Sequence, residues 1–145
     1  MTTKTKNGRL IAIEYQIPVC STEKICSPDA AYEILKPDFN LLAEEMYVLV
    51  LNNQHNVLHK IMILRGEMNM LMCTPANIFR SVLIAGGNAF LLAHNHPSGS
   101  LTPSEEDKVF TTKVSKAATV IGLKMLDHII FTDSGFFSFK QNNLF

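Results

Sequence analysis

Hydrophobic and polar positions repeat along the chain with two different periods, which together predict strands and helices. Short apolar or alternating runs indicate buried strands, and apolar positions three or four residues apart indicate amphipathic helices. The predicted strands are 46–51, 57–64, 89–93, 124–132 and 136–139, with β-prone stretches at 10–17 and 68–72. Helices are predicted to follow Ser27, Thr74 and Ser104. This mixture predicts an α/β fold in which helices pack on the faces of one sheet.

Each predicted helix begins with a side chain that can cap it. Ser27, Thr74 and Ser104 carry hydroxyl groups that accept hydrogen bonds from the first helical turn. Pro28 and Pro75 suit the first helical position. The predicted stop signals are Pro37, Gly86-Gly87 and Gly122.

Composition fits one compact domain and excludes a broadly charged surface. The chain has 145 residues, of which 47 % are hydrophobic and 18 % charged. Its 13 basic and 13 acidic residues cancel at neutral pH. General electrostatic attraction to nucleic acid or to an anionic membrane is therefore not expected.

The cysteines and the apolar runs predict a cytoplasmic protein that is not in a membrane. Cys20, Cys26 and Cys73 are odd in number and lack CxxC spacing, which argues against a disulfide framework or a cysteine zinc site. No apolar signal-peptide core follows residues 1–9. No apolar run approaches the roughly 18 residues that a membrane span needs.

The segment 94–107 carries the clearest chemical signal. His94 and His96 are two apart at the end of a predicted buried strand, so their imidazoles can share one face. Asp107 falls in the first turn of the next predicted helix, three residues after Ser104. Two imidazoles and one carboxylate are typical of a catalytic zinc site that leaves a position for water. On these residues alone, a structural histidine pair with Asp107 as a capping residue remains an alternative.

The same segment resembles the RadC family. It reads HNHPSG at 94–99 and TPS-x-x-D at 102–107, and it is similar to the wider JAMM (MPN+) metalloprotease motif, which here takes the form H-x-H-P-x6-S-x-x-D. The resemblance spans roughly residues 37–145. It includes the strand Tyr47–Leu51, the stretch Ile78-Phe79-Arg80 after Pro75, and Asp127-His128-Ile129-Ile130.

The resemblance implies a cytidine-deaminase-like (JAB/MPN) three-layer fold with a mixed central β-sheet flanked by helices. Residues 37–145 would form the zinc domain, and residues 1–36 an N-terminal extension with a strand and a short helix. His94, His96 and Asp107 would hold one zinc ion per chain. Ser104 would hydrogen-bond the attacking water or the developing oxyanion, and the alternative is that it only caps the helix.

Two features depart from the family pattern. JAMM enzymes use an upstream glutamate as general acid and base, but the slots expected for it hold Ile61 and Met62. Glu67 is the nearby carboxylate that could substitute, or it is a solvated residue at the end of a strand. The arginine that follows the family's proline is also missing, because Ala76 follows Pro75.

The function that the resemblance implies is a zinc metallopeptidase that cleaves an amide or isopeptide bond in a peptide or protein. The alternative is a catalytically weak zinc module that binds a partner protein or DNA, with DNA repair suggested only by the family name. Self-association is a further expectation. His128 is expected either near the zinc ligands or as a satisfied core histidine. Deaminase chemistry is disfavoured because the HxE and PCxxC motifs are missing.

Overall fold

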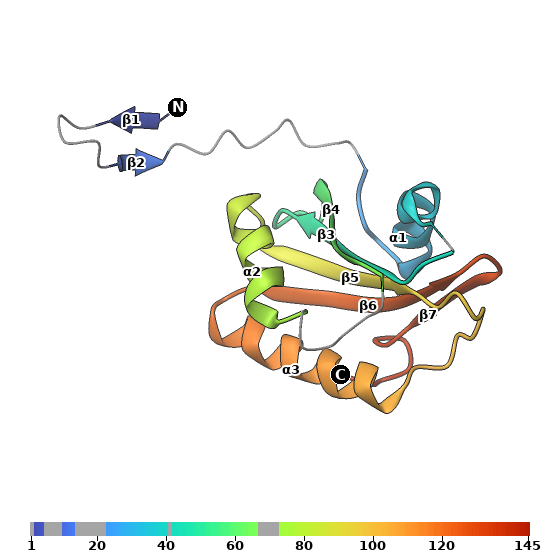
Figure 1. The fold of residues 1–145 in the computed structure, drawn as a ribbon. Helices are drawn as coiled ribbons and strands as arrows, with labels where there is room; N and C mark the ends of the chain where they lie inside the picture. The colour runs from blue at the N-terminus through green and yellow to red at the C-terminus, as the bar shows by residue number, and fades with distance from the viewer. Residues whose placement is uncertain (1, 5–9, 14–22, 41, 67–72) are drawn as a thin grey trace.

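The computed structural model describes residues 2–4, 10–13, 23–40, 42–66 and 73–145 (Figure 1). Its helices are α1 (Pro28–Leu35), α2 (Pro75–Ile84) and α3 (Glu105–Val120), with a 3₁₀ turn, η1, at Lys36–Asp38. The strands of the main sheet are β3 (Glu45–Leu51), β4 (Val57–Arg65), β5 (Ala89–Asn95), β6 (Lys124–Thr132) and β7 (Gly135–Ser138). Strands β1 (Thr2–Lys4) and β2 (Leu10–Ile13) pair with each other in a second sheet. The strand expected at 68–72 lies outside the described residues.

The main sheet is mixed, with the order β4-β3-β5-β6-β7. Strands β3 and β4 form the predicted antiparallel hairpin, and β3 also pairs antiparallel with β5. Strands β5 and β6 run parallel, and α3 provides the connection between them. This parallel pair brings the carboxyl ends of β5 and β6 to the same edge of the sheet.

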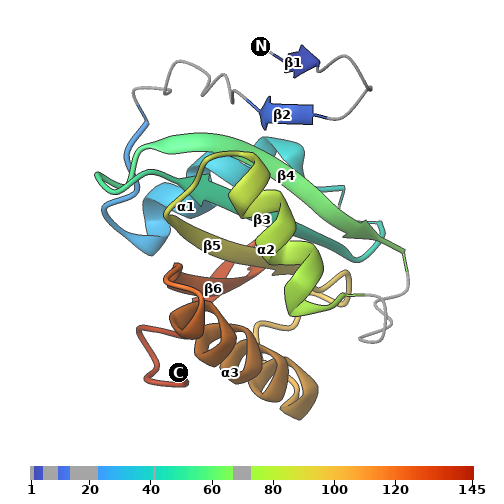
Figure 2. The same ribbon diagram turned by 90° about the vertical axis from the view of Figure 1, so that its left-hand side faces the viewer.

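Helices cover both faces of the sheet (Figures 1 and 2). Helix α1 packs on one face, where Ala31, Tyr32 and Leu35 join a buried cluster from β3, β5 and β6. Helices α2 and α3 pack on the opposite face and contribute six buried residues, namely Ile78, Phe79, Val82, Phe110, Val114 and Ala118. The prediction of a mixed α/β fold with helices on the sheet is therefore confirmed. Among the described residues, no helix is long and apolar enough to cross a membrane.

The three predicted helix starts are confirmed by their capping bonds. Ser27 Oγ accepts from the backbone N–H of Ala30 at 3.2 Å. Thr74 Oγ1 accepts from Asn77 at 3.4 Å, and Ser104 Oγ accepts from Asp107 at 3.0 Å. These bonds span only three residues, which is why the local sequence predicts them well.

Candidate metal centre

Strand β5 carries His94 to the edge of the sheet. All seven residues from Ala89 to Asn95 are buried, because β5 lies between two strands and under helices on both faces. The strand continues two residues past the predicted end at Ala93 and includes His94, whose side chain is 1 % exposed. His94 is thus a buried imidazole on a rigid element.

The loop after β5 returns the chain to the same edge. Gly99 has a φ of 78°, a left-handed conformation that favours glycine, and its N–H donates to the carbonyl of His96 at 2.9 Å. The loop ends at Ser104, where α3 begins with a capping box: Ser104 N donates to Asp107 Oδ2 at 2.8 Å. Asp107 is thereby fixed in the first turn, 7 % exposed, facing inward.

The end of strand β5, the loop that follows it and the start of helix α3 bring three candidate ligands together. His94 Nε2 lies 3.0 Å from His96 Nε2 and 3.4 Å from Asp107 Oδ1. His96 Nε2 lies 3.6 Å from Asp107 Oδ2. One ligand atom from each residue lies within 4.8 Å of the others, close enough to share a metal ion. We call these three residues the candidate metal centre.

The other ring nitrogen of His96 is engaged outside this centre. His96 Nδ1 lies 2.8 Å from the carbonyl oxygen of Ser100. A carbonyl can only accept, so Nδ1 carries the proton in this bond. A neutral His96 therefore presents the lone pair of Nε2 to His94 and Asp107, which is the form that binds a metal.

Electrostatics in the centre favour a positive charge. The neighbouring Asp107 carboxylate raises the pKa of His96, although burial opposes this shift. Burial alone would raise the pKa of Asp107, but its contacts with His94 and His96 hold that pKa well below the usual range. Asp107 is therefore a carboxylate at neutral pH, and the lone pairs around it suit a shared cation. This donor set fits the predicted zinc ion, and it also admits other divalent metals.

Ser104 is the N-cap of α3, the role that the capping alternative assigned to it. Its hydroxyl oxygen accepts from Asp107 N, and this bond does not use the hydroxyl proton. Capping and donation to a substrate oxygen therefore do not compete for the same atom. The proposed role of Ser104 as a donor is compatible with its position at the N-cap.

The sequence offers Glu67 as a general base, and the slots expected for the family's glutamate hold Ile61 and Met62. Glu67 lies outside the described residues, so its role stays a prediction. Ile61 and Met62 lie on β4, the edge strand, which β3 separates from β5. Two strand spacings, about 10 Å, therefore separate β4 from the strand that carries His94.

Strand β3 offers a carboxylate that the sequence did not single out. Met46 is the register partner of His94 in the antiparallel pair of β3 and β5, so Glu44 falls opposite His96 when the register is continued. The chain is held there on both sides, since Gly66 N donates to Glu44 O at 2.9 Å and Glu45 N donates to Asn95 Oδ1 at 2.6 Å.

Continuing the alternation of β3 by one residue favours a Glu44 side chain on the face of the sheet that carries the candidate metal centre. Residues two apart share a face, and Met46 packs in the cluster under α2 and α3. After Asp107, the charge of Glu44 is among the causes that raise the pKa of His96. Glu44 is a half-buried carboxylate beside the centre. The sequence signal that could have found it is a glutamate directly before the strand that pairs with the histidine strand.

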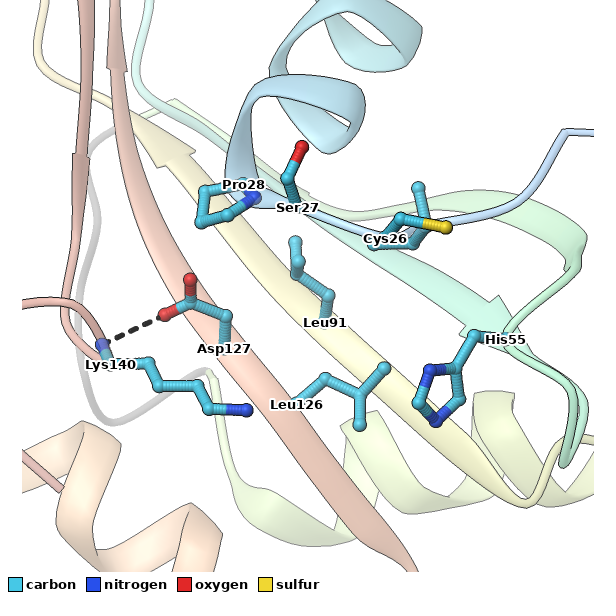
Figure 3. Close-up of a pocket in the computed structure, with 9 residues that line it drawn as sticks. Cys26, Ser27, Pro28, His55, Leu91, Leu126, Asp127 and Lys140 are labelled. Carbon is cyan, nitrogen blue, oxygen red and sulfur yellow. Dashed lines mark hydrogen bonds between the residues drawn. The ribbon is translucent and has the colours of Figure 1, made fainter.

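His128 lies directly behind His94. Its Nε2 is 2.7 Å from His94 Nδ1, and its ring is buried. The preceding residue, Asp127, faces the opposite side of the sheet, where it lines a separate cavity with Cys26 and Leu91 (Figure 3). Asp127 accepts hydrogen bonds from the backbone of His128 and Lys140 and from Ser138, so its carboxylate is structural and does not reach the centre.

Known proteins resemble this chain over most of its length. The profile of the RadC-like JAB domain matches residues 25–144. The chain is 34 % identical over 121 residues to UPF0758 protein STH371 of Symbiobacterium thermophilum, covering 83 % of this chain and 52 % of that protein. It is 38 % identical over 120 residues to a UPF0758 protein of Carboxydothermus hydrogenoformans, covering 82 % and 53 %. The chain thus spans about half the length of the curated relatives it matches.

Proposed function

The chain belongs to the RadC-like JAB domain family, and from this premise we propose that it is a zinc-dependent hydrolase that cleaves an amide or isopeptide bond. The observation that carries the proposal is the convergence of His94, His96 and Asp107 within 4.8 Å at one edge of the sheet.

We further propose that the fold is the cytidine-deaminase-like three-layer arrangement of the JAB/MPN class. Helices on both faces of a mixed five-stranded sheet support it. The division into an extension, 1–36, and a zinc domain, 37–145, is also a proposal, although α1 packs on the main sheet.

His94, His96 and Asp107 would hold the metal through Nε2, Nε2 and a carboxylate oxygen. Zinc in such a site supplies a Lewis acid that polarises a carbonyl and makes water nucleophilic near neutral pH. The distance of 3.0 Å between the two imidazole nitrogens supports this proposal, because a common point about 2 Å from each needs no large rearrangement.

Glu44 and Ser104 would handle protons around that point. The Glu44 carboxylate, placed beside His96, would accept a proton from the attacking water and return it to the leaving amine. The Ser104 hydroxyl would donate to the oxygen of the scissile carbonyl as negative charge develops there. Both roles need groups at the mouth of the centre, and both residues are at least partly exposed.

A peptide or protein is the substrate that this chemistry suits best. Association with DNA and self-association remain proposals that rest on the family, since the chain corresponds to about half of its relatives. The apolar Ile61 and Met62 at the expected glutamate slots favour a second candidate, a metal-binding module with weak catalysis that recognises a partner.

Hydrolysis assays with a Glu44→Gln variant test the proposal. Fluorescence-quenched peptides and lysine-isopeptide substrates would be offered to zinc-loaded protein. We expect cleavage by the wild type and a loss of at least about 100-fold in kcat/KM for Glu44→Gln, with zinc affinity retained. Glu106→Gln, which changes an exposed acid on α3, is the matched control and should cleave normally.

Two results would point to a different general base or to a different function. Full activity of Glu44→Gln would remove Glu44 as the general base and return attention to Glu67. Zinc binding without cleavage in every form would support the partner-binding module.

A further inference from the structure

A line of buried hydrogen bonds runs from the candidate metal centre into the protein interior. His94 Nδ1 lies 2.7 Å from His128 Nε2, and His128 Nδ1 lies 2.6 Å from Thr111 Oγ1. Thr111 Oγ1 in turn donates to the backbone carbonyl of Asp107 at 2.6 Å. Thr111 and His128 are completely buried, so water does not compete for these bonds. The line starts on one candidate ligand, His94, and returns to another, Asp107.

The direction of each hydrogen bond in this line follows from the last acceptor, the backbone carbonyl of Asp107. The carbonyl of Asp107 can only accept, so the single hydroxyl proton of Thr111 is used there. Thr111 Oγ1 must then accept from the Nδ1–H of His128. A neutral His128 consequently has a bare Nε2, which accepts from the Nδ1–H of His94. A neutral His94 therefore presents a bare Nε2 to His96 and Asp107.

We propose that His128 and Thr111 are positioning residues that fix the tautomer and ring orientation of His94 and thereby strengthen metal binding. The inference rests on the proposed metal site, and it adds two residues whose side chains need not touch the metal. Partners behind a ligating histidine orient the ring and raise its basicity, and their loss usually lowers metal affinity 10- to 100-fold.

The structure holds His128 itself tightly. Its ring stacks on Phe139, with centroids 4.7 Å apart and planes 10° from parallel. The ring is completely buried, and each of its nitrogens lies within hydrogen-bond distance of a buried partner. A ring that is already ordered can accept the hydrogen bond from His94 Nδ1 with little further loss of side-chain entropy when the metal binds.

A register irregularity places His128 on the correct face. Phe90 pairs with Met125, but Leu91 pairs with Asp127, so β6 contains one extra residue at Leu126. Because side chains alternate, this extra residue moves His128 to the face that carries His94. The β-bulge is thus the backbone feature that makes the proposed positioning possible.

Substitutions of His128 separate positioning from packing. In His128→Gln the side-chain oxygen can still accept from His94, whereas His128→Leu retains an apolar side chain but removes the acceptor. We expect zinc affinity in the order wild type, then Gln, then Leu, with Leu at least 10-fold below wild type. A purely structural role for this buried ring would favour Leu over Gln in folding and would leave the affinities alike.

Thr111→Val provides a second variant that should keep the fold. It is nearly isosteric and removes only the hydroxyl, and we expect a loss of zinc affinity of about 10-fold or more. Thr119→Val is the matched control, since Thr119 Oγ1 makes the same kind of bond, to Ser115 O at 3.1 Å, but on the exposed part of α3. Thr119→Val should bind zinc like the wild type.

Nitrogen-15 NMR of the histidine rings in metal-free protein gives a readout independent of zinc. We expect His94 and His128 both to carry the proton on Nδ1 at neutral pH, and Thr111→Val to disturb this pattern. Equal zinc affinities for wild type, Thr111→Val and His128→Leu would overturn the positioning role while leaving the metal site intact. A wild type that binds no zinc would overturn the proposed function first, and the positioning role with it.

Discussion

At the residue scale, each candidate ligand is held by a bond that leaves its metal-facing atom available. Ser100 holds the outer nitrogen of His96, His128 holds that of His94, and the N–H of Ser104 holds one oxygen of Asp107. The three remaining atoms carry lone pairs and point to one region. A site that is ordered in this way before the cation arrives needs little further loss of side-chain entropy on binding.

Cys73 is a second residue whose environment controls its protonation. It is 2 % exposed, and its thiol donates to Met46 Sδ at 3.3 Å in the core under α2. Burial raises the pKa of Cys73 from 9.0 to about 11. The folded protein therefore keeps the thiol neutral at a pH where the unfolded chain ionises it.

This shift predicts a loss of stability in alkali. The contribution of the neutral thiol is fully present below pH 9.0 and is lost as the pH rises toward about 11. Urea unfolding of wild type and Cys73→Ala, compared at pH 8 and pH 10.5, measures it. The stability of the wild type relative to the variant should fall by about 1–3 kcal/mol between these values. A difference that does not change with pH would show that the thiol is solvated in the folded protein.

The sequence identified the candidate ligands, which lie close together along the chain. It missed Glu44, which lies far along the chain from the residues it approaches. His94, His96 and Asp107 belong to one continuous segment, so spacing and motif were sufficient to predict their proximity. Glu44 lies 52 residues from His96 and reaches it only through the register of β3 on β5. Sequence periodicity predicts each strand but does not define which residues stand opposite each other.

At the scale of elements, the capping box of α3 joins helix formation to the candidate metal centre. Ser104 and Asp107 satisfy each other's backbone N–H groups, and Asp107 at the same time faces the two histidines. The N-terminus of α3 therefore fixes the position of the Asp107 carboxylate. Stability of α3 and order of the centre are linked through these two residues.

Substitution of Ser104 tests this link. Ser104→Ala should lower the free energy of unfolding by about 1 kcal/mol, because one capping bond is lost. Thr74→Ala is the matched control: it removes the cap of α2, a helix that carries none of the three candidate ligands, at a similar energetic cost. Ser104→Asp should restore the cap without restoring a donor proton. Urea unfolding measures the stabilities.

Hydrolysis by the same variants separates the cap from the donor. If Ser104 also donates to the carbonyl oxygen, Ser104→Ala and Ser104→Asp should both lose about 100-fold or more in kcat, while Thr74→Ala should not. Normal turnover by Ser104→Ala would limit Ser104 to capping.

Strand β6 shows what element prediction leaves out. The apolar run at 124–132 predicts the strand correctly, yet the extra residue at Leu126 has no signal in the periodicity, since β6 is buried on both sides and does not alternate. Strict alternation would put His128 on the other face, so periodicity alone does not predict its contact with His94.

At the scale of the whole molecule, the parallel pair β5–β6 and the helix that connects it locate the site. Polar residues at the carboxyl ends of adjacent parallel strands form clefts in open α/β sheets. Here β5 delivers His94, α3 begins at the same edge, and β3 brings Glu44 to it from the other side. Helices α1, α2 and α3 cover the faces and leave this edge accessible.

The fold class followed from the sequence because caps, breakers and apolar runs act locally, but the strand order did not. The hairpin of β3 and β4 was predicted from its short turn. The insertion of β3 between β4 and β5 depends on contacts between distant segments, which composition and periodicity do not specify. The resemblance to the RadC family, which the motif at 94–107 carries, is confirmed by the family match over residues 25–144.

The most direct test of the central claim is the structure of the protein crystallised with saturating zinc, with anomalous scattering recorded at the zinc edge. We expect one peak per chain about 2.0–2.2 Å from His94 Nε2, His96 Nε2 and an oxygen of Asp107, with Glu44 beside the open position. No peak at this edge of the sheet, or zinc held by other residues instead, would contradict the claim.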